Sequence, residues 1–178
     1  FNAAKMLNTK FLADLSECYT KTLQELDVSF DSIYGPAYKG IFLASIIGTS
    51  LGESDLDIPI SFNRKEEKDH GEGGDIVGQL PSGNVLIVDD VISAGTAARE
   101  SIEKIKSIGA NPKVMLVGLD RQEKGSSEIS AKAELENDFG LTVSSIVNLD
   151  LLISFVSDAP NFKEFKSDLE EYRSNWGA

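Results

Sequence analysis

The residues best suited to chemistry stand together in the run VLIVDDVISAGTA, from Val85 to Ala97. Apolar residues typical of a buried strand lead to two adjacent carboxylates, Asp89 and Asp90, and a loop of small and hydroxyl residues, Ser93 to Thr96, follows. In an open α/β sheet, ligands bind beyond the carboxyl ends of the strands, and the start of a helix binds anions through its free N–H groups. Because carboxylates repel phosphate, we expect the acids to bind sugar hydroxyls or a hydrated metal ion while the loop binds phosphate.

An acidic strand end also occurs in α/β proteins without such a site, since Asp is favourable near a helix N-terminus. The combination of both acids with the whole Ser-Ala-Gly-Thr loop favours the ligand site. The run therefore predicts a site for a phosphorylated sugar.

A second turn suited to anions is GPAYKG, from Gly35 to Gly40, between a predicted strand and a predicted helix. Its glycines and proline allow a tight turn and a close approach of the backbone to a ligand. Lys39 adds a positive charge, which suits pyrophosphate. Taken alone, the segment fits a plain turn with an exposed lysine equally well, but a second anion-binding turn at the same sheet edge favours the functional interpretation.

The third segment is the charged run RKEEKDHGEGG, which begins at Arg64. Mixed charge on a loop usually marks only a solvated surface. Here Arg64, Lys65 and Lys68 cluster with His70, the single histidine of an acidic chain, and the glycines that follow allow hinge motion. We expect a mobile loop at about residues 63–75 that brings cations to a polyanionic substrate, neutralises its leaving group and excludes water.

An arginine follows the next predicted strand, in the run LDRQ. The planar fork of the Arg121 guanidinium suits a carboxylate or an acyl oxygen. Taken alone, a surface ion pair between Arg121 and Asp120 is the simpler interpretation.

Composition limits the possible partners. The chain of 178 residues is long enough for one domain with a substantial core, and its net charge of −12 argues against general binding to nucleic acid or to an anionic membrane. Its apolar runs are shorter than the roughly 20 residues of a membrane span. The single cysteine, Cys18, fits a reducing cytoplasm, and we expect it to be a small buried residue of a helix.

Apolar periodicity predicts the elements that position these segments. We expect helices over residues 8–26, 38–51, 96–108 and 129–139, short helices over 151–156 and 162–172, and strands over 30–34, 58–62, 85–88, 114–119 and 143–147. Strands that alternate with helices indicate parallel βαβ units with right-handed crossovers. The sequence predicts an α/β fold, a central and mainly parallel sheet flanked by helices, in one domain over residues 1–178.

The motifs resemble the type I phosphoribosyltransferases, and among these the orotate phosphoribosyltransferase family of bacterial pyrimidine biosynthesis. The run from Val85 to Ala97 resembles the phosphoribosyl pyrophosphate (PRPP) signature of the superfamily. GPAYKG, the RKxxKDHGEGG loop and LDRQE narrow the resemblance to the orotate branch. The resembling stretches extend over nearly the whole chain and are FNAAKMLNT, FDSIYGPAYKGI, FNRKEEKDHGEGG, VLIVDDVISAGTAARES and LDRQEKG. The resemblance implies the type I fold and Mg²⁺-dependent transfer of ribose 5-phosphate from PRPP to N1 of orotate, which yields orotidine 5′-monophosphate and pyrophosphate.

The resemblance also implies roles for individual residues. Asp89 and Asp90 would bind the ribose hydroxyls and, with Lys68, form the catalytic set. The loop that would bind the 5-phosphate consists of Val91, Ile92, Ser93, Ala94, Gly95, Thr96 and Ala97. The residues that would contact pyrophosphate are Tyr38 and Lys39, together with Arg64, Lys65, Lys68 and His70 from the neighbouring subunit of a homodimer. The positions matched to orotate contacts are Phe1, Ser93 and Arg121.

Physical chemistry agrees with these implied roles. Cleavage of the bond between C1 and pyrophosphate places positive charge on the ribose and negative charge on the leaving group, which Mg²⁺ and the loop cations stabilise. Mg²⁺ prefers oxygen ligands and retains water, so we expect substrate oxygens and water, and no cage of protein side chains, to bind it. Members of the family carry a further N-terminal segment with a substrate-site lysine ahead of the position matched by Phe1. Without that segment we expect weaker orotate binding and activity.

Two other functions fit part of the pattern. A phosphoribosyltransferase for another base shares the PRPP site, but Arg121 and Phe1 favour a carboxylated pyrimidine. A non-catalytic PRPP-sensing regulator shares the fold, but the acidic net charge, the lack of a basic helix and the intact loop with Lys68 and His70 favour catalysis.

Overall fold

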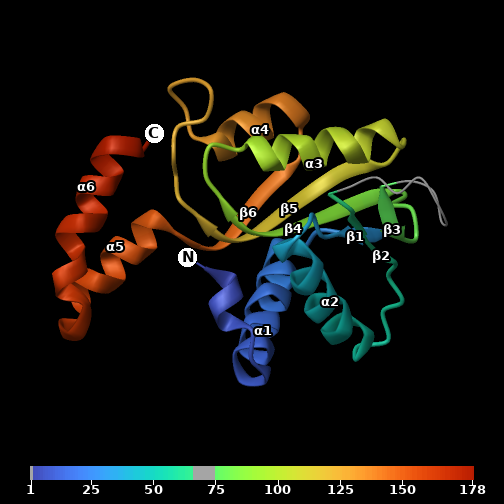
Figure 1. The fold of residues 1–178 in the computed structure, drawn as a ribbon, viewed down its shortest axis with the longest axis horizontal. Coiled ribbons are helices and arrows are strands. Elements are labelled where there is room, and N and C mark those ends of the chain that lie inside the picture. The colour runs from blue at the N-terminus through green and yellow to red at the C-terminus, as the bar shows by residue number, and fades with distance from the viewer. Residues whose placement is uncertain (1, 66–74) are drawn as a thin grey trace.

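The computed structural model describes residues 2–65 and 75–178, with a six-stranded sheet at its centre (Figure 1). The strand order is β3-β2-β1-β4-β5-β6, and all neighbours are parallel except β2 and β3, which pair antiparallel. The strands are β1 (Ser32–Tyr34), β2 (Ile60–Asn63), β3 (Ile76–Gly78), β4 (Asn84–Ile92), β5 (Asn111–Asp120) and β6 (Thr142–Asn148).

Helices cover both faces of this sheet (Figure 1). On one face lie α1 (Thr9–Leu26), preceded by the short 3-10 helix η1 (Ala3–Met6), and α2 (Lys39–Gly52); on the other lie α3 (Thr96–Ser107) and α4 (Ala131–Phe139). Because side chains of a strand alternate between faces, Val85 and Ile87 of β4 pack in the core beneath α3 and α4, whereas Leu86 and Val88 pack against α1 and α2. The central strand is therefore fixed from both sides.

The C-terminal helices lie apart from these two layers (Figure 1). They are α5 (Leu149–Asp158), the 3-10 helix η2 (Pro160–Phe165) and α6 (Lys166–Trp176), and neither η2 nor α6 contains a buried residue. Within residues 2–65 and 75–178, no helix has the length and apolar content that a membrane crossing requires.

The predicted α/β fold with a central, mainly parallel sheet is confirmed, and several local predictions are corrected. The helix predicted over 162–172 is the 3-10 helix η2 followed by α6, which continues to Trp176. β4 does not end at Val88 but continues to Ile92, so Asp89 and Asp90 lie inside the strand, because β5 offers backbone partners along this whole length. β3 and η1 were not predicted, since such short segments carry little periodicity.

Cys18 is exposed rather than buried, because the core face of α1 is formed by Leu15 and Tyr19. The mobile loop predicted for residues 63–75 falls mainly on residues 66–74, outside the described part of the chain.

Candidate active site

Asp89 and Asp90 stand near the carboxyl end of β4 and have different surroundings. Asp89 lines a cavity together with residues of α3. Asp90 is 4% exposed, and its Oδ2 accepts a hydrogen bond from Nζ of Lys39, the first residue of α2, at 2.7 Å. The backbone N–H of Asp90 donates to Oδ1 of Asp89 at 2.8 Å and so orients that carboxyl group. One acid is therefore paired with a cation, while the other faces open space.

Electrostatics separates the two acids further. Burial raises the pKa of Asp89 to about 6, and the neighbouring charge of Asp90 acts in the same direction. The hydrogen bond from the Asp90 N–H and the charge of Lys39 lower this pKa but do not offset the burial. Above about pH 6 the Asp89 carboxylate is ionised and able to accept hydrogen bonds from hydroxyl groups.

Tyr19 of α1 contacts the backbone of this pair of acids. Its side chain is fully buried, and its hydroxyl donates to the backbone carbonyl of Asp89 at 2.8 Å. Burial and the two carboxylates raise the pKa of Tyr19 far above its usual range, against a smaller effect of the Gly118 N–H, so the hydroxyl stays protonated. In the sequence Tyr19 is only one apolar position of a helix, and no local signal reveals this contact.

The loop after β4 leads into α3 through Gly95, whose φ of 85° lies in the left-handed region that favours glycine. Among the described residues, no side chain caps the N-terminus of α3, whereas Asn8, Ser130 and Asn148 cap α1, α4 and α5. Uncapped N–H groups of a first turn are available to an anion. A cavity of about 230 Å³ opens at this point, lined by Asp89, residues 91–98 and Met115.

The GPAYKG turn brings α2 to the same edge. A Cβ on Gly35 would lie 2.1 Å from the Gly40 carbonyl oxygen, and one on Gly40 would lie 2.8 Å from the Val88 carbonyl oxygen, so only glycine permits this approach. The backbone N–H of Ala37 donates to Oδ1 of Asn63 at 2.8 Å, which joins the turn to the end of β2. The turn therefore occupies a fixed place beside the β4 acids.

Tyr38 and Lys65 extend the site outward from this turn. The Tyr38 side chain is 69% exposed, and Nζ of Lys65 lies 5.0 Å from the centroid of its ring, in a cation–π contact. The two side chains thus present a cation and a hydroxyl to solvent next to the acids of β4.

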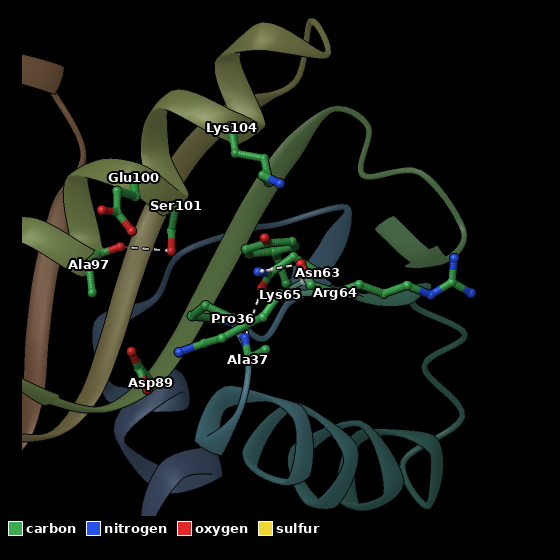
Figure 2. A pocket seen from close by; sticks show the side chains of 11 residues that line it. Pro36, Ala37, Asn63, Arg64, Lys65, Asp89, Ala97, Glu100, Ser101 and Lys104 are labelled. Atoms are coloured by element: carbon green, nitrogen blue, oxygen red, sulfur yellow. Dashed lines mark hydrogen bonds between the residues drawn. The ribbon is translucent and has the colours of Figure 1, made fainter. Parts of the chain in front are cut away.

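A larger cavity of about 430 Å³ joins these parts (Figure 2). It shares Asp89 and Ala97 with the smaller cavity, so the two spaces adjoin. Figure 2 shows the Lys65 amine extending toward the side where Asp89 lies, whereas the Arg64 guanidinium points away from it. The full lining is Tyr34, Pro36, Ala37, Asn63, Arg64, Lys65, Asp89, Ala97, Glu100, Ser101 and Lys104.

Several lining residues were missed in the sequence. Ser101 and Lys104 follow Ala97 at intervals of four and three along α3, a spacing that places all three on one helix face and that could have revealed them. Lys104 forms an ion pair with Asp75 at the rim of the cavity. Asn63 carries no such signal, because its contact depends on the approach of two distant segments.

Arg121 lies outside both cavities and has other partners than expected. Its Nη1 lies 3.3 Å from Oε1 of Glu123 and 3.4 Å from the hydroxyl of Tyr172 in α6. Among the described residues, the alternative ion pair of Arg121 with Asp120 is not formed: Arg121 pairs with Glu123, and Oδ1 of Asp120 accepts the N–H of Gln122 at 2.8 Å. Phe1, Lys68 and His70, also predicted for the site, lie outside the described residues.

The fold and these contacts define a class of protein. An open parallel sheet carries paired acids on its central strand, an uncapped helix start beside them and a second tight turn at the same edge. This is the arrangement of a protein that binds a phosphorylated sugar at the carboxyl end of the sheet.

Known proteins identify the family within that class. Residues 4–135 match the phosphoribosyl transferase domain. The orotate phosphoribosyltransferases of Laribacter hongkongensis and Pseudomonas savastanoi pv. phaseolicola are 44% and 47% identical to this chain; each alignment covers 99% of it, and 83% and 84% of the respective relative. A crystal structure of the orotate phosphoribosyltransferase of Francisella tularensis matches with a TM-score of 0.81 and 34% identity, over 100% of this chain and 86% of the other. The chain belongs to the orotate phosphoribosyltransferase family, and the resemblance of the motifs is confirmed.

Proposed function

We propose that this chain transfers the ribose 5-phosphate of PRPP to N1 of orotate, the reaction that belongs to its family, and so acts as a transferase of pyrimidine biosynthesis. The observation that carries the proposal is the position of Asp89 between two adjoining cavities, one at the uncapped start of α3 and one beside the GPAYKG turn. A ligand with a sugar between two anionic groups suits this arrangement.

We assign the 5-phosphate to the smaller cavity. There the residues from Val91 to Ala97 surround the N-terminus of α3, and anions are favoured at such a helix end by both its N–H groups and its dipole. Asp89 and Asp90 then accept hydrogen bonds from the ribose hydroxyls. Because Lys39 already balances the charge of Asp90, the pair presents less repulsion to the phosphates than two bare carboxylates.

We assign pyrophosphate to the larger cavity, beside Tyr38 and Lys39, with Arg64 and Lys65 supplied by the partner subunit of the homodimer proposed below. Leaving-group charge develops here as the bond to C1 breaks, and nearby cations lower the energy of that state. Lys68 and His70 are proposed for the same role by family resemblance alone, since they lie outside the described residues.

Magnesium fits the residues present. Asp89 and Asp90 offer hard oxygen ligands, while residues 2–65 and 75–178 contain no group of three or more potential protein ligands. This donor set suits an ion that is bound mainly by substrate oxygens and water. When bound, Mg²⁺ neutralises charge on the pyrophosphate.

We place orotate next to Ser93 and Arg121, with Phe1 at its base. The Arg121 backbone N–H donates to the carbonyl of Ile92 at 3.1 Å, which joins the arginine to the residue before Ser93. A guanidinium at this point suits the carboxylate that distinguishes orotate from uracil.

We also propose a cytoplasmic homodimer in which the loop of residues 63–75 reaches the site of the partner subunit. Exposed apolar side chains on the C-terminal helices, including Leu151, Phe155 and Phe165, support an interface, since such groups are costly in water. The exposed free Cys18 is compatible with a reducing compartment. Light scattering tests the dimer: a mass of twice 19.3 kDa is expected, and a monomer at assay concentration contradicts it.

The test of the reaction is the loss of orotate absorbance with the purified chain and PRPP, in Mg²⁺ or in a chelator. We expect orotate to be consumed only when both PRPP and Mg²⁺ are present, and uracil, adenine and hypoxanthine to be left intact. Consumption of another base would indicate a different phosphoribosyltransferase. PRPP binding in calorimetry without consumption of any base would favour the PRPP-sensing regulator.

A further inference from the structure

The last helix, α6, buries none of its side chains, and besides its contacts with α5 and η2 it is joined to one short segment that follows β5. The backbone N–H of Lys124 donates to the Trp176 carbonyl at 3.0 Å, and Glu123 pairs with Gly177 in an antiparallel bridge. This segment begins with Arg121. The end of α6 is thus attached to the residues that directly follow the arginine.

A ring of three side chains strengthens this attachment. Tyr172 of α6 donates its hydroxyl hydrogen to Oε1 of Glu123, and Nη1 of Arg121 donates to both of these groups, at 3.4 and 3.3 Å. Both contacts are longer than the roughly 2.7–2.9 Å that is usual for charge-assisted bonds of arginine. The guanidinium is therefore oriented by the ring without being bound tightly. Among the described residues it donates only through Nη1, which leaves its other N–H groups for a further acceptor.

The backbone beside the arginine is fixed as well. Gln122 has a φ of 54°, in the left-handed region, which is unfavourable for a residue other than glycine and persists only where neighbours impose it. Its side chain forms two hydrogen bonds with Asp150, at 2.9 Å each, one through the Asp150 backbone N–H and one through its carboxylate. Arg121 itself is bonded through its N–H to Ile92, at the start of the phosphate loop.

From these contacts we propose that Tyr172 is a positioning residue that, with Glu123, fixes the Arg121 guanidinium for the carboxylate of the incoming base. The C-terminal helix thereby sets the preference for a carboxylated pyrimidine over an uncharged one. This inference rests on the proposed function, because it takes orotate as the base. A long arginine side chain loses considerable rotamer freedom on binding, and a preformed ring removes part of that cost before the base arrives.

The test is Tyr172→Phe, which keeps the ring and removes the hydroxyl. We expect the KM for orotate to rise about tenfold, with the KM for PRPP unchanged and the melting temperature within a few degrees of the parent. The preference for orotate over uracil, measured as a ratio of kcat/KM values, should fall by a similar factor. The matched control is Lys166→Ala, which removes an ion pair with Glu170 on the same helix and leaves the ring and Asp150 intact. This control should keep the orotate KM of the parent.

An unchanged orotate KM in Tyr172→Phe, or equal changes for orotate and PRPP, would overturn the proposal and leave α6 a purely structural role. A second measurement uses the unsubstituted protein: the ¹³Cζ resonance of Tyr172 should shift when orotate is added with PRPP and stay constant with uracil. No shift with orotate also overturns it. If the parent consumes no orotate at all, the proposed function fails instead, and the two failures are thereby distinguished.

Discussion

Replacing Asp89 with asparagine should stabilise the free protein while removing its ability to bind PRPP. Burial raises the pKa of Asp89 from 3.8 to about 6, so ionisation of this carboxyl group opposes folding. A rise of about two pKa units corresponds to roughly 3 kcal/mol. The raised pKa therefore contributes its full stabilisation of the folded protein below about pH 4. This contribution is lost as the pH rises through about 6. Asparagine carries no charge, and its oxygen can still accept the 2.8 Å hydrogen bond from the Asp90 N–H.

Urea unfolding at two pH values measures this effect. At pH 8 we expect Asp89→Asn to raise the free energy of unfolding by about 2–3 kcal/mol and the melting temperature by about 5 °C. At pH 5 about half of that gain should remain, because the native carboxyl group of the parent is then mostly protonated. Asp90→Asn should instead lower the free energy of unfolding by roughly 1–2 kcal/mol, since it removes the partner of Lys39, which is itself 41% exposed.

Both variants should lose PRPP binding in titration calorimetry, because a neutral amide accepts ribose hydroxyls more weakly than a carboxylate. The matched control is Asp31→Asn, at the opposite end of β4, where the carboxylate accepts the N–H of Asn84 at 2.7 Å and an amide oxygen can do the same. It should leave PRPP affinity unchanged. A less stable Asp89→Asn at pH 8, or a gain that does not vary with pH, would refute the argument from burial.

Three further predictions concern the same site. Lys68→Ala should lower kcat far more than it weakens PRPP binding, because loop cations act mainly on the leaving group. Equal losses of the pre-steady-state rate and of the affinity for PRPP would contradict this. Tyr19→Phe removes the hydroxyl that donates to the Asp89 carbonyl at 2.8 Å and should raise the KM for PRPP about tenfold, with the inhibition constant of pyrophosphate unchanged. An equal rise in both constants would indicate general damage to the site. Gly40→Ala should lower the melting temperature by several degrees, since its Cβ would lie 2.8 Å from the Val88 carbonyl oxygen, and an unaltered melting curve would show that the turn can relax.

The fold could be predicted from sequence because its signals are local. Apolar residues from Val85 to Val88 mark the central strand, and the helix that follows shows its own period and a terminating glycine. The extension of β4 to Ile92 was not predictable from these residues alone, since polar side chains usually end a strand. It depends on pairing with β5, where Asp89 lies opposite Val117 and Ile92 opposite Asp120.

The sequence also predicted that the acids and the loop from Ser93 to Thr96 lie together at the sheet edge, but it did not predict their partners. The ion pair of Lys39 with Asp90, 51 positions along the chain, could not be predicted from either segment. Arg121 contacts Tyr172, which is also 51 positions away in the sequence. Such pairs form because the topology brings distant helix ends to one sheet edge, and no periodicity within a segment reports which residues meet there.

In the proposed reaction, C1 of PRPP becomes bonded to N1 of orotate in this site. The most direct measurement is an NMR spectrum of the product formed from PRPP labelled with ¹³C at C1 and orotate labelled with ¹⁵N at N1. We expect a one-bond coupling between the two labels, together with the ³¹P signal of free pyrophosphate, only when Mg²⁺ is present. Labelled ribose 5-phosphate without such a coupling, or unreacted PRPP, would contradict it.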